Sequence, residues 1–222
     1  MSRRKLSRFR HNAEAGNVIE RGKELYTTIK GKWNEVYFKN KNPLVLELAC
    51  GKGEYTVGLG SRFPERNFIG IDIKGDRIAR GSARAGELAL KNVAFLRTGI
   101  QFLDEFFEEN EVSEIWLVHP DPQPRDKEEK RRLTNTRFLN LYKTYLKDGG
   151  IFHLKTDSRF LFDYSLEVMK SDPEFEILDA TTDLYNSPLM EGHFEIVTHY
   201  ERFFTERGAT INYLKARLHK KK

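Results

Sequence analysis

A buried apolar run ends in a glycine turn near residue 50, an arrangement that can bind a nucleotide. Residues 44–54 read Leu-Val-Leu-Glu-Leu-Ala-Cys-Gly-Lys-Gly-Glu. Gly51 and Gly53 let the backbone turn tightly and approach a ligand at a helix N-terminus. Asp72 follows the next apolar run, about 20 residues later, where an acidic side chain can bind the hydroxyls of a ribose. Gly51 and Asp72 are therefore candidate cofactor residues.

The character of this turn narrows the cofactor. It lacks the G-x-G-x-x-G pattern of dinucleotide sites, and Glu47 stands at the end of the preceding apolar run. A buried carboxylate there would repel a pyrophosphate but suits a cofactor with an ammonium and a sulfonium, such as S-adenosylmethionine. The alternatives are a purely structural glycine turn, Asp72 as a helix N-cap, and Glu47 paired with Lys52. A nicotinamide dehydrogenase is disfavoured by Glu47 and by the absent third glycine.

A proline-rich loop carries the second group of candidate residues. Residues 119–125 read His-Pro-Asp-Pro-Gln-Pro-Arg, followed by a charged stretch up to Arg132. The prolines remove backbone donors and stiffen the loop, which fixes the direction of Asp121. An ordinary proline turn is the alternative. A rigid acid followed by basic residues, beside a cofactor crevice, predicts an anionic substrate.

These residues need a framework of strands that end at one edge. We predict strands over residues 44–48, 68–71, 93–96, 115–118 and 151–155, helices over 54–62, 76–90, 134–146 and 158–170, and an added strand over 194–204. Alternation of apolar strands and helices indicates a doubly wound α/β domain with a mostly parallel sheet. Ligands of such sheets bind at the carboxyl ends of the strands, where Asp72 and Asp121 would meet.

Charge is distributed unevenly along the 222 residues. The chain has 38 Lys and Arg against 33 Asp and Glu, a net charge of +5. The two ends carry ten basic residues and no acid, namely Arg3, Arg4, Lys5, Arg8, Arg10, Lys215, Arg217, Lys220, Lys221 and Lys222. We predict a flexible, unpatterned basic N-terminal arm (1–22), one domain (23–214) and a basic C-terminal tail (215–222). Basic ends on an acidic body indicate a nucleic acid partner, with solubilising tails as the alternative.

Composition excludes several classes of protein. A single cysteine, Cys50, cannot form an internal disulfide or a zinc cluster, so we expect no metal and a reducing compartment such as the cytoplasm. Cys50 is interpreted as a packing residue, because no histidine lies near it in the pattern. The apolar runs are too short for a membrane span or a secretory signal.

The chain resembles the bacterial tRNA (guanine-N7)-methyltransferases from the Glu47 strand to Glu201. The motifs that carry the resemblance are Glu47-Leu-Ala-Cys-Gly-Lys-Gly-Glu54, Phe68-Ile-Gly-Ile-Asp-Ile-Lys74, Pro120-Asp-Pro122, Lys130-Arg-Arg-Leu-Thr134, Leu154-Lys-Thr-Asp157 and Thr198-His-Tyr-Glu201. The proline-acid-proline loop with the basic stretch behind it is more specific than the glycine turn. The resemblance implies a Rossmann-like methyltransferase fold with a mostly parallel seven-stranded sheet and helices on both faces.

The resemblance also implies roles for individual residues. Asp121 would lie beside the methyl-transfer centre as the catalytic residue. Glu47, Gly51, Asp72, Gly99, Ile100 and Asp121 would bind S-adenosylmethionine, and Arg125, Asp157, Thr198 and Glu201 would line the guanine site. The implied substrate is a variable-loop guanine of tRNA, conventionally numbered 46, acted on by a monomer or a homodimer. Without the resemblance, Asp157 reads as an N-cap of the helix at Ser158, and Thr198 and Glu201 as an exposed strand rim.

Four positions depart from the pattern of the family. Gly99 stands where an acidic or amide residue usually reads the adenine, which leaves the backbone of residues 99–100 or Gln101 for that role. His119 and Gln123 replace common aromatic residues, and Arg125 replaces a Lys. An amino-group methyltransferase and a non-catalytic RNA-binding protein are the other readings, although the former usually has Pro-Pro and an aromatic residue after the Asp.

Overall fold

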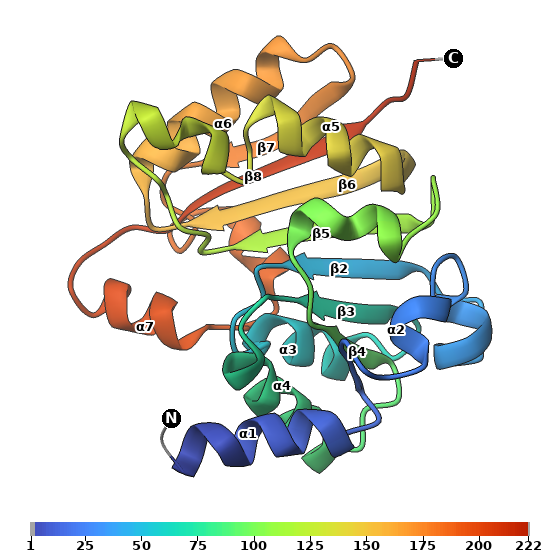
Figure 1. Cartoon of the computed structure of the whole chain (residues 1–222). Helices are drawn as coiled ribbons and strands as arrows, with labels where there is room; N and C mark the ends of the chain where they lie inside the picture. Colours follow the sequence, from blue (N-terminus) through green and yellow to red (C-terminus); the bar gives the residue numbers. More distant parts are fainter. Residues whose placement is uncertain (1–2, 222) are drawn as a thin grey trace.

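The structure is a computed structural model that describes residues 3–221, so Lys222 of the basic tail lies outside the described residues (Figure 1). Short helices of 3-10 or π type are labelled η. The elements are α1 (Arg3–Glu14), β1 (Val18–Ile19), α2 (Leu25–Thr28), η1 (Trp33–Phe38), β2 (Leu44–Leu48), α3 (Glu54–Arg62), β3 (Asn67–Ile71), α4 (Gly75–Glu87), β4 (Val93–Leu96), η2 (Ile100–Glu105), β5 (Val112–Val118), η3 (Asp126–Arg131), α5 (Thr136–Tyr145), β6 (Leu146–Thr156), α6 (Arg159–Ser171), β7 (Phe175–Thr181), η4 (Pro188–His193), α7 (His199–Thr205) and β8 (Asn212–Leu218).

One mixed sheet organises the chain. Its strand order is β1-β4-β3-β2-β5-β6-β8-β7. The strands from β1 to β6 pair in parallel, whereas β8 runs antiparallel between β6 and β7. The order reverses between β2 and β5, so this is the doubly wound α/β fold that the sequence predicts. The carboxyl ends of the parallel strands lie on the left of Figure 1, at the edge that α7 also approaches.

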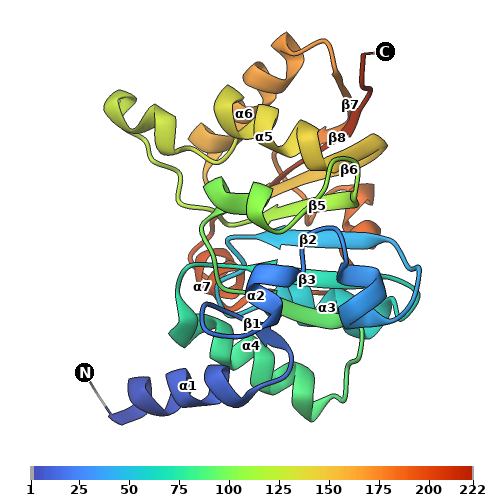
Figure 2. The ribbon, with the colours of Figure 1, turned by 45° about the vertical axis from the view of Figure 1, so that its right-hand side comes forward.

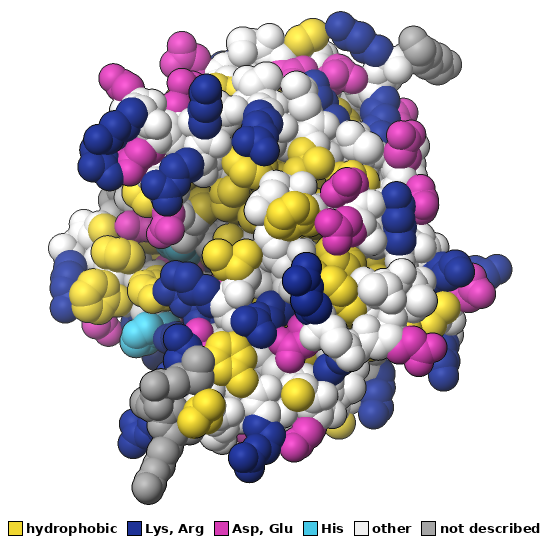
Figure 3. All heavy atoms as spheres, in the orientation of Figure 1, with side chains coloured by type: hydrophobic (Ala, Val, Ile, Leu, Met, Phe, Trp, Pro, Cys, Tyr) yellow, Lys and Arg dark blue, Asp and Glu magenta, His cyan; other side chains and the backbone are white. Residues whose placement is uncertain are grey.

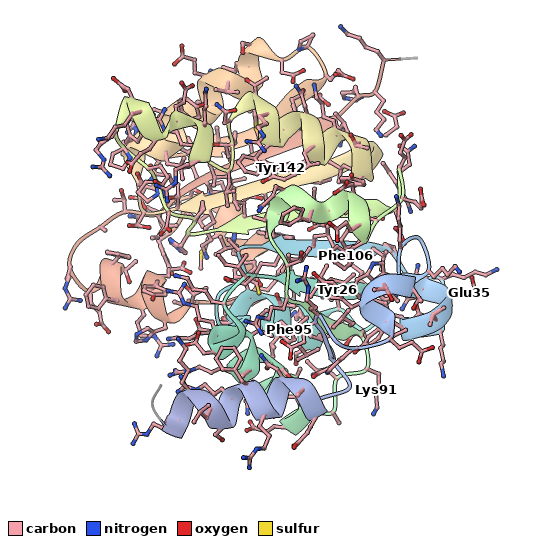
Figure 4. All side chains as sticks on the ribbon, viewed as in Figure 1. Tyr26, Glu35, Lys91, Phe95, Phe106 and Tyr142 are labelled. Atoms are coloured by element: carbon pink, nitrogen blue, oxygen red, sulfur yellow. The ribbon has the colours of Figure 1, made fainter. Side chains whose placement is uncertain are left out.

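Both faces of the sheet are covered, which explains the continuous apolar runs of its central strands. Leu44, Leu46 and Leu48 of β2 pack in the core on the side of η1, η2 and α5, where Figure 4 labels Phe106 and Tyr142. Val45 belongs to the second core, on the side of α3 and α4, together with Phe95 of β4. Figure 2 shows the sheet turned, with α2 in front of it and α3 behind. This alternation places Glu47 on the α3 side.

The predicted strand over residues 194–204 is wrong. Thr198 and Glu201 form a capping box, in which each binds the backbone N–H of the other, and this starts helix α7 instead. The spacing Thr-x-x-Glu in the sequence is the signal for that helix. The added strands are β7 and β8, and the two-residue β1 extends the other edge beside β4. The sheet of the described residues therefore has eight strands rather than seven.

The N-terminal segment has more structure than the sequence indicates. Residues 3–14 form α1, which packs along α4 mainly through polar contacts. His11 Nε2 lies 2.9 Å from Ser82 Oγ, and Asn12 Nδ2 donates to Gly75 O over 2.7 Å. Lys23 Nζ donates to three carbonyl oxygens at and beyond the end of the helix. The helix lacks an apolar stripe because it is attached by these polar contacts, so hydrophobic periodicity could not predict it.

The basic C-terminal tail is also partly a strand. Lys215 and Arg217 belong to β8, where Leu214, Ala216 and Leu218 alternate with them and are buried. The ammonium of Lys215 lies 3.6 Å from Asp179, and the guanidinium of Arg217 lies 3.3 Å from Glu176, both on β7. These charges are therefore partly balanced within the fold. No helix of the described residues is long and apolar enough to cross a membrane.

Candidate active site

A cleft lies at the carboxyl edge of β2, β3, β4 and β5, between the glycine turn and the proline loop. It consists of an open part of about 530 Å³ and an adjoining, more apolar part of about 200 Å³. Both parts are lined by Ala49, Asp72, Ile73, Gln101, Leu133 and Phe138. The smaller part adds Gly99 and Ile100, and the larger adds His119 and Asp121. The cleft therefore brings together candidate residues from the glycine turn, the Asp72 turn and the proline loop.

Asp72 holds the glycine turn in place. Its carboxylate accepts hydrogen bonds from the backbone N–H of Gly51 over 2.9 Å and of Lys74 over 2.8 Å. Gly53 has a φ of 66°, and a Cβ added there would lie 2.4 Å from the ring of Phe95, so only glycine fits. The turn thus keeps a left-handed backbone against the core. Asp72 is not an N-cap of α4, which begins without a side-chain cap bond.

Glu47 lies beneath the turn rather than in the wall of the cleft. The Oε2 atom of Glu47 accepts hydrogen bonds from the backbone N–H and from the hydroxyl of Thr56 on α3. The carboxyl group forms no ion pair with Lys52. Burial raises the pKa of Glu47 to about 8, although the bonds from Thr56 favour the charged form. A cation bound at the turn would favour its ionised form.

The space above Gly99 is filled by a neighbour. A Cβ added at Gly99 would lie 2.7 Å from both amide atoms of Gln101, so the glycine leaves room for the Gln101 side chain. Gln101 lines both parts of the cleft, beside the apolar walls formed by Ile73 and Ile100. The amide group that the sequence lacks at position 99 is thus supplied from position 101.

The proline loop holds Asp121 at the open part of the cleft. His119 and Gln123 on either side have positive φ angles of 48° and 47°. The backbone N–H of His119 bonds to Lys155 O over 2.8 Å, and Arg132 Nε donates to Gln123 O over 3.0 Å. These two bonds fasten both ends of the loop, while the Asp121 side chain remains exposed. The carboxylate is therefore presented to the cleft by a fixed backbone.

Behind this loop lies a network of buried charges. His119 Nδ1 lies 3.0 Å from Asp157 Oδ1, and its Nε2 lies 3.7 Å from Glu201 Oε2. The Nζ atom of Lys155 lies 2.6 Å from Glu201 Oε1, and both side chains are completely buried. The hydroxyl of Tyr185 donates to the same oxygen over 2.8 Å. Residues from β6, α7 and two loops therefore converge on Glu201.

The network fixes the charges of its members. Burial alone would raise the pKa of Glu201, but His119 and Lys155 facing it lower the pKa to about 2. Burial would lower the pKa of His119, but Asp157 and Glu201 raise it above its usual value. Asp157 is half-buried, and its pKa is lowered by His119 in spite of burial. Glu201 and Asp157 are therefore carboxylates at neutral pH.

The low pKa of Glu201 predicts an acid-sensitive fold. A carboxyl group whose pKa falls from 4.5 to about 2 on folding stabilises the fold above pH 4.5. This contribution is lost as the pH falls from 4.5 to about 2, as Glu201 takes up its proton. We expect the free energy of unfolding, measured in urea at several pH values, to decline over that range less steeply in Glu201→Gln than in the wild type. Parallel declines would contradict the assignment.

Three predicted guanine-site residues lie together, and the fourth does not. Asp157, Thr198 and Glu201 surround the same network, joined by His119 and by the capping box of α7. Arg125 lies at the start of η3, where its guanidinium pairs with Glu128. The interpretation of Thr198 and Glu201 as an exposed strand rim is wrong, because both are buried. The N-cap of α6 is Ser158 rather than Asp157.

Two members of the network were missed in the sequence, Lys155 as a partner of Glu201 and Tyr185. A signal for Lys155 exists, because it stands in the apolar run of β6, where a lysine needs a buried partner. Tyr185 lies in a loop without a pattern. Among the described residues, no group of three or more His, Cys, Asp or Glu side chains is placed to hold a metal ion.

The doubly wound sheet and the cleft at its switch point define a Rossmann-like methyltransferase. Residues 41–214 match the family model described as a putative methyltransferase. The chain is 50% identical over 217 residues to the tRNA (guanine-N(7)-)-methyltransferase of Cytophaga hutchinsonii, covering 97% of each chain. It is 48% identical over 222 residues to that of Christiangramia forsetii, covering 98% of this chain and 99% of the relative. The chain belongs to the tRNA (guanine-N7)-methyltransferase family.

Solved structures share the fold at low sequence identity. A 16S rRNA methyltransferase, KamB, superimposes with a TM-score of 0.63 at 15% identity, covering 84% of this chain and 92% of that one. A 16S rRNA (adenine(1408)-N(1))-methyltransferase from Catenulisporales acidiphilia gives a TM-score of 0.60 at 13% identity, covering 86% and 94%. These likenesses support the methyltransferase fold.

Proposed function

We propose that this protein transfers the methyl group of S-adenosylmethionine to N7 of guanine 46 in the variable loop of tRNA. The observation that carries the proposal is membership of the tRNA (guanine-N7)-methyltransferase family over nearly the full chain, with Asp121 in the cleft that Asp72 and the glycine turn line. The guanine number rests on the resemblance of the motifs to this family.

The cleft fits S-adenosylmethionine on chemical grounds. The apolar part, with Ile73, Ile100 and Phe138, suits an adenine ring, and the amide of Gln101 can read its edge. Asp72 has a carboxylate for the ribose hydroxyls, and the Gly51 turn approaches the ligand with its backbone. Glu47 beneath the turn balances the positive charge. When bound, this cofactor supplies a methyl group on a positively charged sulfur.

The enzyme acts mainly by positioning. N7 of guanine carries an in-plane lone pair and no proton, so no general base is needed before methyl transfer. The protein must hold N7 in line with the methyl group, which is catalysis by proximity. The purine gains positive charge during transfer, and the carboxylate of Asp121 in the open cleft stabilises that charge. Because the proline loop is fastened at both ends, little reorganisation of Asp121 is required.

The guanine site is divided between an accessible acid and a buried one. Guanine presents N1–H and an exocyclic amine as adjacent donors, and one carboxylate can accept both. Asp157 has a side chain that is 26% exposed, whereas Glu201 is completely buried against Lys155. We therefore assign the direct contact to Asp157. Glu201 and Thr198 then hold His119 and the start of α7 in place behind it.

The decisive test is transfer of labelled methyl from S-adenosylmethionine to an unmodified tRNA transcript. We expect the label at one variable-loop guanine, with strand cleavage after borohydride and aniline, since only N7-methylguanine gives that cleavage. A transcript with adenine at position 46 is the matched control and should accept no label. Label on an exocyclic amine, or on another nucleotide, would contradict the proposal.

A further inference from the structure

A second, basic hollow lies on the far side of the glycine turn. It has a volume of about 690 Å³ and is formed by α3, α4 and α7. We call it the α7 groove. Its basic lining residues are Lys52, Arg80, Arg84, His199 and Arg202. In Figure 3, Lys and Arg side chains gather on the lower left, where α7 approaches α3 and α4.

The positive charge of this groove is largely unbalanced. Within the part of the chain that the structure describes, Lys52, Arg80 and Arg202 have no carboxylate within ion-pair distance. Arg84 pairs only with the exposed Glu87, a contact that solvent weakens. Glu54, the acid in the lining, already accepts a hydrogen bond from the backbone N–H of His199 over 3.1 Å. The groove therefore attracts an anion.

Exposed aromatic rings stand beside these cations. Tyr200 and Phe203 lie one turn apart on α7 and are 47% and 42% exposed. The ammonium of Lys52 lies 5.6 Å from the centre of the Tyr200 ring, and the guanidinium of Arg207 lies 3.5 Å from that of Phe203. Rings and cations combined in this way bind single-stranded nucleic acid, because bases stack on the rings while phosphates meet the cations.

The groove is joined to the candidate active site at two points. Lys52 directly follows Gly51 of the glycine turn, which lies below the cleft. Helix α7 presents Glu201 to the buried network at His119 and presents Arg202 to the groove. A strand whose target base lies at Asp121 and Asp157 would therefore continue into the α7 groove.

We propose that the α7 groove binds the phosphate backbone of the tRNA segment that flanks the target guanine, with Tyr200 stacking on one of its bases. This proposal rests on the proposed function and extends it by naming the surface that holds the substrate strand. A polyanion fits better than a protein partner, because three cations without carboxylates would have to be neutralised by the ligand. It places the phosphate contacts on the body of the protein, whose sequence charge without its basic ends is negative.

The test compares two double variants of equal charge. Arg80→Gln/Arg202→Gln removes two cations from the groove, while Lys41→Gln/Lys170→Gln removes two exposed cations from segments near the amino ends of the strands. Filter binding of unmodified tRNA at several KCl concentrations gives affinity and its salt dependence. We expect the groove variant to bind about tenfold or more weakly and its log–log salt slope to fall by about 2, since each phosphate contact contributes about 0.9. The control variant should match the wild type.

Tyr200 gives an independent arm of the test. Tyr200→Ala should weaken tRNA binding about tenfold with an unchanged salt slope, because stacking is lost and no charge is removed, whereas Tyr200→Phe should bind normally. Hydroxyl-radical footprinting should show the flanking variable-loop nucleotides exposed in the groove variant. Wild-type affinity and slope in the groove variant would overturn the proposal. Wild-type protein that binds tRNA through the groove but forms no N7-methylguanine would instead overturn the proposed function.

Discussion

Asp121→Asn is expected to lower the rate of methyl transfer at saturating substrates by about 100-fold to 1,000-fold, the usual effect of removing one preorganised charged group from a reacting centre. The reason is geometric and electrostatic. Asp121 lines the open part of the cleft, and its loop is fastened through His119 and Gln123. An amide in the same place keeps the shape but cannot offset the positive charge that reaches the purine.

The measurement is single-turnover transfer of labelled methyl, together with calorimetric titration of S-adenosylmethionine. Affinity for the cofactor should stay close to that of the wild type, because Asp72, the glycine turn and the apolar part of the cleft remain. Asp126→Asn, an exposed acid at the start of η3 in the neighbouring stretch, is the matched control and should transfer methyl normally. Wild-type turnover in Asp121→Asn would remove Asp121 from the mechanism.

Lys155→Met is expected to lower the free energy of unfolding by about 3–5 kcal/mol, the cost of leaving one buried ion without its partner. Lys155 and Glu201 are completely buried and lie 2.6 Å apart. Methionine fills a similar volume, so the loss comes from the unpaired carboxylate of Glu201 rather than from a cavity. Unfolding in urea, followed by circular dichroism, measures this change.

A double-mutant cycle separates the ion pair from packing. Lys155→Met/Glu201→Gln removes both charges and should recover much of the stability lost in Lys155→Met, because a neutral amide pays a smaller desolvation cost. Lys143→Met is a control, since that lysine contacts Asp172 and Glu174 nearer the surface, and it should cost less. If the double variant were less stable than Lys155→Met, the uncompensated charge would not be the cause.

Much of the framework could be predicted because its signals are local. The strand, glycine turn and helix over residues 44–62 lie where the apolar run and Gly51 and Gly53 place them. Parallel strands carry their ligands at the carboxyl edge, and this rule was enough to bring Asp72 and Asp121 to one cleft. The strand over residues 194–204 failed because the capping box outweighs a weak alternation, and α1 was missed because polar contacts attach it.

The sequence by itself determined the fold class, the family and the turn and loop that face the cleft, because backbone preferences and apolar periodicity act over a few residues. Only the tertiary structure decided which charges meet. Lys155 is inert in the sequence until β6, α7 and two loops place it against Glu201, and Gln101 takes the place of a side chain at position 99 only after the turn folds. The physical reason is that the electrostatic energy of a buried group depends on partners far away in the chain, which come together only when the fold is complete.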